Sequence, residues 1–449
     1  MPTQDKFPAQ RLFAVVSTSA FTIIALSTMS TTAIAPVIGR ELHGTQYFPL
    51  IFGLSAGMQV ISTVLAGVWV DARGAKPSLL VGTCALLASL LGAGLAPNIA
   101  TFLLARALDG IANGLVLVPL YVLAATLVHP NRRADMFALF SAAWVLPSLV
   151  GPVLAGFASQ AWGWRATYLA LGIIFLPVLL FATRLFSRIE NAHQEVPKAI
   201  RNRSMWAVIA GGAVVILQLS SALTGMARLL AMVAGIVLAI IGIGKVLPAG
   251  TLWAAGSIPA WVGARGLFNG SFITLEVFIP LMLQNTRGYS VGASGLALAL
   301  GSATWAAGSF LGGRSFARPR LATLPVAGAI VLAVGIALTS TAAWPNLPAW
   351  LFLFGWVIAG TGMGMAFAPL SVLVLGKAPK EEQGLQSANI QVADSLGMAL
   401  IMGIVASLMS VFTSSYGPAP YLPALGVAFF CTLLAALSSW RGQRHSRRT

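Results

Sequence analysis

The sequence predicts an all-α polytopic membrane protein with fourteen transmembrane helices. Of its 449 residues, 57% are hydrophobic and only 8% are charged, whereas soluble domains carry about 25% charged residues. Apolar stretches close to the roughly 20 residues that a helix needs to cross the hydrocarbon core recur along the whole chain. Lysine and arginine gather in alternate loops, which is typical of a multi-pass protein.

The predicted spans form a group of six, a central pair and a second group of six. The first group comprises 12–36, 47–70, 78–95, 100–128, 136–158 and 166–185. The pair comprises 205–221 and 229–246, and the last group 253–283, 291–311, 321–340, 347–375, 385–411 and 421–440. The polar loop 187–204 separates the first group from the pair, so we expect three units: 1–188, 189–250 and 251–449. The pair has no acidic residue, and we expect it at the periphery, with Gln218 in a contact between helices.

The basic residues orient these helices with both termini in the cytoplasm. Four arginines fall in loops on the outer side: Arg40, Arg165, Arg228 and Arg287. Arg106 and Arg265 lie in or near the membrane, and the other lysines and arginines fall on the cytoplasmic side, as the positive-inside rule requires. The basic residues behind the net charge of +16 therefore serve to orient the helices, and we expect no nucleic-acid partner. We expect the protein in the cytoplasmic (inner) cell membrane.

The residue types that carry enzyme or metal chemistry occur in no recognisable pattern. The two cysteines, Cys84 and Cys431, lie inside apolar spans, where free cysteine packs as a small hydrophobe. The four histidines fall in loops or the tail, with no zinc-ligand spacing, phosphate-binding glycine loop or Ser/His/Asp set. We expect neither an enzyme nor a bound cofactor or metal.

The fourth span carries charge where the flanking sequence is apolar. Arg106, Asp109 and Asn113 are spaced three and four residues apart, so they share one helix face. Charged side chains in hydrocarbon usually face a bundle interior or a wet cavity, so we expect this face to line a transport pathway. The alternative is an Arg–Asp pair that neutralises itself and pins helices together.

Two further motifs concern helix ends and helix shape. A cytoplasmic motif at the end of the second span contains Gly67, Asp71, Arg73, Gly74 and Lys76. The fifth span contains Pro147, Gly151, Pro152 and Gly156. Proline interrupts backbone hydrogen bonds and glycine allows close helix packing, so a kink is expected in this span.

Together with the fourth-span motif, these patterns resemble the major facilitator superfamily, in particular its fourteen-helix drug:proton antiporter branch. The second half adds Gly362, Gly364, Pro369, Gly384 and Gly397, which are also similar to that branch. The resemblance implies two six-helix bundles plus two extra central helices, a gating role for the cytoplasmic motif, and an antiporter role for the fifth-span motif. It also implies alternating access, a monomer in the lipid bilayer, and the proton as coupling ion.

The sequence departs from the family pattern at several positions. Ala72 and Ala75 stand where the family usually has basic residues, and Asp109 stands where it often has glutamine. The first span has no acid in residues 27–35, where the branch typically carries one. Another acid must then supply proton coupling.

Three acidic residues lie deep in the predicted spans. Counting along the helices places Asp109 about 13 Å and Glu276 about 12 Å from the outer surface, and Asp394 about 14 Å from the inner surface. Arg106 should favour the ionised form of Asp109, whereas Glu276 and Asp394 have no basic residue within four positions. We expect Glu276 or Asp394 to carry the proton, with Asp109 third. A structural hydrogen bond to a neighbouring helix is the alternative for each.

The rest of the predicted pathway is apolar, aromatic and amide-bearing. With Arg106, its candidate cavity residues are Asn113, Trp144, Phe268, Asn269, Phe272, Trp305, Asn389 and Gln391. Such a lining suits a small lipophilic substrate, and a carboxylate would select cations. We expect proton-coupled export of such compounds. Open alternatives are a dedicated exporter of an endogenous metabolite or lipid, and a proton-coupled uptake symporter. A channel or structural protein predicts neither deep acids nor similar halves.

Overall fold

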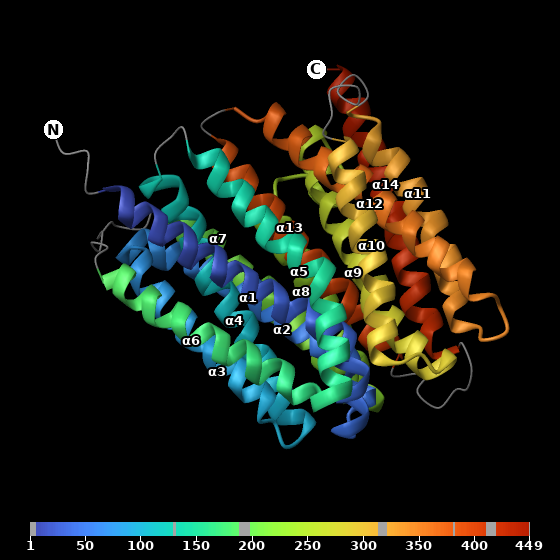
Figure 1. The fold of residues 1–449 in the computed structure, drawn as a ribbon. Helices are drawn as coiled ribbons and strands as arrows, with labels where there is room; N and C mark the ends of the chain where they lie inside the picture. Colours follow the sequence, from blue (N-terminus) through green and yellow to red (C-terminus); the bar gives the residue numbers. More distant parts are fainter. Residues whose placement is uncertain are drawn as a thin grey trace.

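The computed structural model describes residues 6–128, 132–187, 198–312, 321–379, 382–409 and 419–448. Within these residues, fourteen helices are long and apolar enough to cross a membrane, and the regular structure is helical throughout. Figure 1 shows them as one bundle with both termini at the same end. The predicted fold class is therefore confirmed. We call the end that carries the termini the termini side, and the opposite end the distal side.

The first six helices pack mainly on one another. They are α1 (Lys6–Glu41), α2 (Phe48–Arg73), α3 (Ala75–Gly94), α4 (Ile99–Leu127), α5 (Arg133–Trp162) and α6 (Trp164–Ser187). Within this first group α4 lies against α2 and α3, and α1 lies against α5 and α6.

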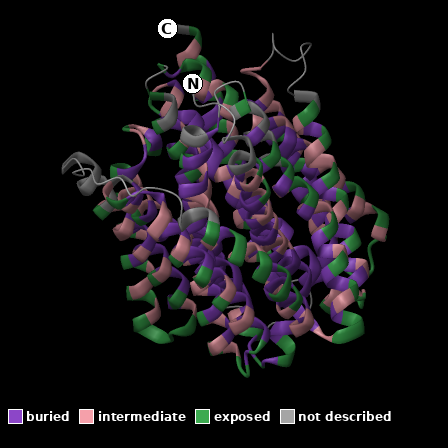
Figure 2. Cartoon of the chain, turned by 60° about the vertical axis from the view of Figure 1, so that its left-hand side comes forward, coloured by how far each residue is buried: buried purple, intermediate pink, exposed green. Residues whose placement is uncertain are grey.

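The last six helices form the second group, with α9 at its centre. They are α9 (Ser257–Arg287), α10 (Val291–Gly312), α11 (Leu324–Thr339), α12 (Ala349–Lys377), α13 (Gln383–Met409) and α14 (Leu422–Arg448). α9 packs on α10, α12, α13 and α14. Buried residues run through the middle of the whole bundle, and exposed residues occupy its outer surface (Figure 2).

The central pair consists of α7 (Lys198–Leu219) and α8 (Gly225–Val246). α8 is peripheral, as predicted, because it packs mainly on α7; α7 is not, because it packs on α2 of the first group and α13 of the second. Gln218 of α7 is buried, and its Nε2 donates to the carbonyl oxygen of Ala399 on α13 at 2.8 Å. The expected helix contact of Gln218 is confirmed.

Two helix boundaries differ from the predicted spans for backbone reasons. α1 continues through Pro36 to Glu41, since neighbouring helices can compensate for a proline within a membrane helix. α9 begins at Ser257, because Gly250, Ala254 and Gly256 have φ values of 91°, 51° and 100°. These left-handed or extended glycine-type conformations end helical geometry before Ser257.

The two groups are joined by side-chain contacts at the distal side. Arg40 of α1 donates from Nη1 to Oδ1 of Asn285 on α9 at 2.7 Å. Gln284 donates from Nε2 to the carbonyl oxygen of Ala33 on α1 at 3.1 Å. The rings of Phe48 on α2 and Phe278 on α9 lie 5.5 Å apart. These contacts hold the two groups together on this side.

Candidate functional site

A buried ion pair links α9 and α13. The Nε and Nη2 atoms of Arg265 each lie 3.0 Å from a carboxylate oxygen of Asp394. Nη1 of Arg265 donates to the carbonyl oxygen of Phe367 at 2.7 Å and to the hydroxyl of Ser371 on α12. The guanidinium also lies 3.3 Å from the ring centroid of Phe367. Three helices therefore converge on Arg265.

This pair changes the expectation for Asp394. A count along its own helix found no basic neighbour, but Arg265 reaches it from 129 residues away in sequence. The side chains of Arg265 and Asp394 are 10% and 19% exposed, so the pair is partly accessible. Asn269, one helical turn after Arg265, donates to the backbone oxygen of Asp394 at 2.9 Å. Asp394 is therefore a paired carboxylate in this structure, although no basic residue lies within four positions of it in the sequence.

Glu276 is buried in a different setting. The residue is 4% exposed, and its carboxyl group has no hydrogen bond or ion pair within the part of the chain that the structure describes. It shares a face of α9 with Arg265, Asn269 and Phe272, which precede it by eleven, seven and four residues. Eleven residues of α-helix rise about 16 Å. Glu276 therefore lies about 16 Å along the bundle from Arg265 and from its partner Asp394.

Toward the distal end of α9, the face that carries Glu276 contacts the first group of helices. Gln284 follows Glu276 by eight residues, which keeps it on the same broad face. Gln284 contacts Ala33 on α1, and α9 packs on both α1 and α10. Glu276 therefore lies on the helix that carries distal contacts between the two groups.

A row of aromatic rings connects the levels of Arg265 and Glu276. Phe367, under the guanidinium, lies edge-to-face with Trp305 of α10 at 5.4 Å. Trp305 lies 5.1 Å from Phe272, and Phe272 stacks on Trp356 of α12 at 4.9 Å. Glu276 is one helical turn beyond Phe272. Ring contacts therefore run without interruption from Phe367, beside the ion pair, to Phe272, which is one helical turn before Glu276.

The fourth-helix cluster packs α4 on α2. Nη1 of Arg106 lies 3.1 Å from Oδ2 of Asp109, and both side chains are 3% exposed. Nε of Arg106 donates to the carbonyl oxygen of Ile51 at 3.2 Å, and the hydroxyl of Ser55 donates to Oδ2 of Asp109 at 2.9 Å. Asn113 donates to the same Asp109 oxygen at 3.3 Å. These contacts favour the helix-pinning interpretation over a pathway lining.

The remaining candidate cavity residues do not form one surface. Phe268 and Phe272 are fully buried, and Trp305 and Asn269 are half-buried. Asn389 is buried and donates to Gln386 on its own helix at 2.9 Å. Trp144 is half-buried on α5, and Gln391 is exposed on α13. The structure brings Asn269, Phe272 and Trp305 together around α9 with Asp394.

The cytoplasmic motif lies where α2 ends and α3 begins. Gly74 has a φ of 77°, and its N–H donates to the carbonyl oxygen of Val70 at 2.8 Å. A side chain at this position would be strained, which explains a glycine between the two helices. Arg73 is exposed and Lys76 is half-buried. Apart from its chain neighbours and the backbone of its own helix, a Cβ built on Gly67 would meet no atom within 4 Å, so close helix packing does not account for this glycine. The side chain of Asp71 lies outside the described residues. Gly308 precedes Arg314 by six residues, as Gly67 precedes Arg73; Gly308 lies inside α10, and Arg314 lies outside the described residues.

The glycines and prolines of α5 lie against both groups. Pro147 and Pro152 are inside a continuous helix, and the backbone oxygen of Gly151 accepts a bond from Ser30 of α1 at 3.4 Å. A Cβ on Gly156 would lie 2.8 Å from the backbone oxygen of Val291 on α10. Because this is closer than a real contact allows, Gly156 permits the close approach of α5 and α10. The expected kink stays a prediction.

Sequence reasoning missed the partners of Arg265. Phe367 and Ser371 are separated from it by 102 and 106 residues, so no local pattern reveals them. The available signal was Arg265 itself, a charge inside an apolar span. An intramembrane arginine requires a carboxylate or backbone oxygen as a partner.

The chain resembles known proteins over most of its length. The model of the Major Facilitator Superfamily matches residues 16–402. "Multidrug resistance protein 3" of Bacillus subtilis is 24% identical, over 88% of this chain and 80% of that protein. A "probable multidrug-efflux transporter" of Mycobacterium tuberculosis is 24% identical over 97% of this chain and 95% of its own. The "puromycin resistance protein pur8" of Streptomyces alboniger is 26% identical, over 84% and 80%.

Solved structures share the arrangement of helices. A D-xylose–proton symporter superposes with a TM-score of 0.68 and 16% identity, covering 97% of this chain and 98% of the other. A bacterial homologue of the lysosomal transporter Spinster, in an inward-facing conformation, gives 0.68 and 14%, covering 98% and 97%. At these identities the likeness concerns the fold alone.

Proposed function

The chain belongs to the major facilitator superfamily, and from this premise we propose that it exports lipophilic, cationic small molecules in exchange for protons by alternating access. The fourteen helices make it a multi-pass membrane protein. Relatives named for multidrug resistance and efflux, each covering most of this chain, support drug-like substrates. The proposal includes a monomer in the cell membrane, with the termini side facing the cytoplasm and no enzymatic step.

The buried carboxyl of Glu276 is the observation that carries this proposal. An ionised carboxylate without a partner is costly in an apolar interior, so the group holds a proton until water or a cation reaches it. A substrate cation that arrives beside Glu276 would stabilise the carboxylate and release the proton. Phe272 and the aromatic row that it belongs to would contact the apolar part of such a substrate.

Alternating access would make and break the contacts on the distal side. Arg40 with Asn285, and Gln284 with Ala33, join α1 to α9 in the present state. Gln284 lies about 12 Å from Glu276 along the same helix, from eight residues at 1.5 Å each. Movement of α9 against α1 would therefore change the exposure of the carboxyl together with the distal contacts.

Asp394 takes second place as a proton carrier in this scheme. Arg265 neutralises its charge in the present state, so protonation of Asp394 requires separation of the pair. We propose that Asp394 and Arg265 hold α9 on α13 and α12, and that Asp109 and Arg106 hold α4 on α2. Both pairs then support the site rather than exchange protons in each cycle.

Transport against a gradient tests the proposal. The purified protein would be reconstituted in proteoliposomes with an imposed pH gradient and a fluorescent lipophilic cation. The parent should accumulate the dye against its gradient, and Glu276→Gln should only equilibrate it. Glu382→Gln, which changes an exposed acid near the start of α13, is the matched control and should behave as the parent.

The direction of coupling separates the alternatives. An uptake symporter would move substrate in the same direction as the protons, and a dedicated metabolite or lipid exporter would be driven by the gradient but would not carry the dye. A parent protein that ignores the pH gradient with every substrate would refute proton coupling itself.

A further inference from the structure

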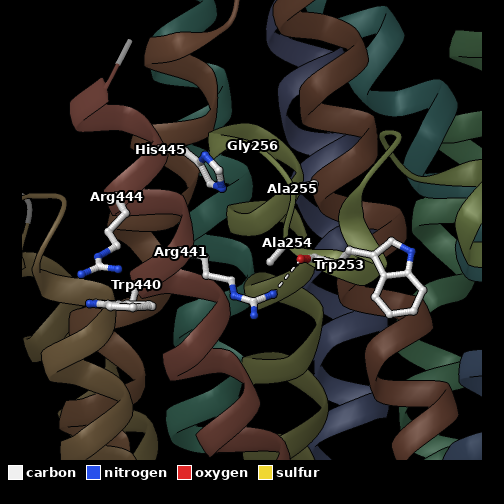
Figure 3. Close-up of a pocket in the computed structure, with 8 residues that line it drawn as sticks. All are labelled: Trp253, Ala254, Ala255, Gly256, Trp440, Arg441, Arg444 and His445. Carbon is white, nitrogen blue, oxygen red and sulfur yellow. Dashed lines mark hydrogen bonds between the residues drawn. The ribbon is translucent and has the colours of Figure 1, made fainter.

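A basic cavity lies on the termini side, where α14 meets the linker between α8 and α9. The cavity has a volume of about 370 Å³, within the range of about 300–1,000 Å³ typical of small-ligand sites. Its lining residues are Trp253, Ala254, Ala255, Gly256, Trp440, Arg441, Arg444 and His445 (Figure 3). We propose that it binds the phosphate headgroup of an anionic phospholipid.

Two arginines give the cavity its charge. Arg441 donates from Nη1 to the carbonyl oxygen of Trp253 at 2.9 Å, which holds its guanidinium at the linker. The guanidinium of Arg444 lies 4.1 Å from the ring centroid of Trp440. Neither arginine has a carboxylate within ion-pair distance among the described residues. Their charges are therefore available to an anion, and a planar guanidinium suits phosphate oxygens.

The linker supplies a preformed wall. Ala254 has a φ of 51°, a left-handed conformation that is uncommon for a residue with a side chain. Hydrogen bonds hold it there: the N–H of Ala254 donates to Thr251 at 3.2 Å, and that of Ala255 donates to Gly250 at 3.0 Å. Gly256, which also lines the cavity, precedes α9 and provides no capping side chain. The N-terminus of α9 adds favourable potential for an anion beside the arginines.

The surface of α14 indicates that the anion belongs to a lipid. Leu433, Leu437, Arg441 and Arg444 follow one another by four, four and three residues, so they share a helix face. All four are exposed. The leucines face outward from an apolar membrane helix, and the arginines follow at its polar end. An acyl chain along the leucines would bring the phosphate to the arginines.

The two tryptophans place the cavity at the membrane boundary. Trp253 and Trp440 are 77% and 40% exposed, and exposed tryptophan is enriched at the level of lipid headgroups. A soluble phosphate compound would gain nothing from the leucine face. With the termini side in the cytoplasm, the site faces the inner leaflet, where anionic headgroups attract basic clusters.

Lipid binding to the purified full-length protein tests this site. Phosphatidylglycerol and phosphatidylcholine would be titrated in detergent, and bound lipid counted by native mass spectrometry. The parent should bind phosphatidylglycerol at least tenfold more tightly than phosphatidylcholine. Each arginine near an anionic headgroup contributes about fivefold, so the variant Arg441→Gln with Arg444→Gln should bind about thirtyfold more weakly.

Two further variants distinguish binding at this cavity from attraction of the lipid by positive charge anywhere on the termini side. Arg11→Gln with Arg447→Gln removes two exposed charges on the same side that do not line the cavity, and its affinity should stay within threefold of the parent. Arg441→Lys with Arg444→Lys keeps the charge and should recover most of the binding, which excludes misfolding as the cause of the loss.

Three results would overturn the proposal. The parent could bind both lipids equally, or the glutamine variant could bind phosphatidylglycerol as tightly as the parent. Alternatively, inorganic phosphate could displace the lipid at the concentration at which the lipid itself binds. The last result would assign the cavity to a soluble anion instead of a headgroup.

Discussion

The ion pair between Arg265 and Asp394 should couple the stability of three helices. Asp394→Asn removes the charge and keeps the shape of the side chain, which leaves the guanidinium of Arg265 with the Phe367 carbonyl, Ser371 and the Phe367 ring. Removing one partner of a fully buried pair costs roughly 3–5 kcal/mol. Partial exposure of the pair and the retained partners lower this, so we expect a loss of about 2 kcal/mol.

The reverse change should cost as much or more. Arg265→Met removes both the ion pair and the contacts with α12, and it leaves Asp394 with no cation. The double variant Arg265→Met with Asp394→Leu removes both charges together, and apolar replacements of buried pairs are often well tolerated. We therefore expect the double variant to be more stable than the sum of the two single losses by about 1–2 kcal/mol.

Thermal unfolding of the purified variants in detergent measures this coupling. A loss of about 2 kcal/mol in a chain of 449 residues corresponds to an apparent Tm lower by roughly 2 °C. Glu382→Gln, a change of an exposed acid, should leave the apparent Tm unchanged. Strict additivity of the two single variants would refute the reasoning, since it would mean that the pair has no interaction energy.

Three other changes test further parts of the structure. Asp109→Asn unpairs the arginine on its own helix, so it should lower stability by about 2 kcal/mol and lower the amount of folded protein more than the flux per folded molecule; an uncoupled but stable variant would contradict this. Arg40→Gln removes a distal hydrogen bond to Asn285, so the population in which α1 and α9 are separated on the distal side should rise by about threefold to tenfold. Double electron–electron resonance between spin labels on the two helices measures this population, and an unchanged distance distribution would contradict the role of the contact. Gly295→Val would clash with the backbone of α5 and should abolish flux while Ala303→Val, at an exposed position of α10, does not; normal flux in both would show that close α5–α10 contact is unnecessary.

Helix number and helix location could be predicted because they depend on local composition. Each span is a predominantly apolar stretch, and the bilayer thickness sets the length that it needs. The pairing of Arg106 with Asp109 could be predicted for the same reason, since both lie on one helix at a spacing of three. The role of the pair could be inferred only from its partners on α2, and these partners favour a role in helix packing.

Contacts between distant segments could not be predicted from one sequence. Asp394 looked isolated along α13, yet Arg265 lies beside it in the fold. α7 looked peripheral because it is apolar and without acids, yet Gln218 joins it to α13. The cavity beside Arg441 depends on the backbone of Ala254 and the position of α14. Each feature depends on how helices pack, which hydropathy does not encode.

The central claim is that Glu276 exchanges a proton for substrate. Proteoliposomes with an acidic lumen should take up a lipophilic cation as protons leave. A pH difference of one unit supplies about 1.4 kcal/mol per proton. We predict that Glu276→Gln lets the cation equilibrate but does not accumulate it at any imposed gradient. Accumulation by Glu276→Gln equal to that of the parent would contradict the account and return the coupling role to another acid.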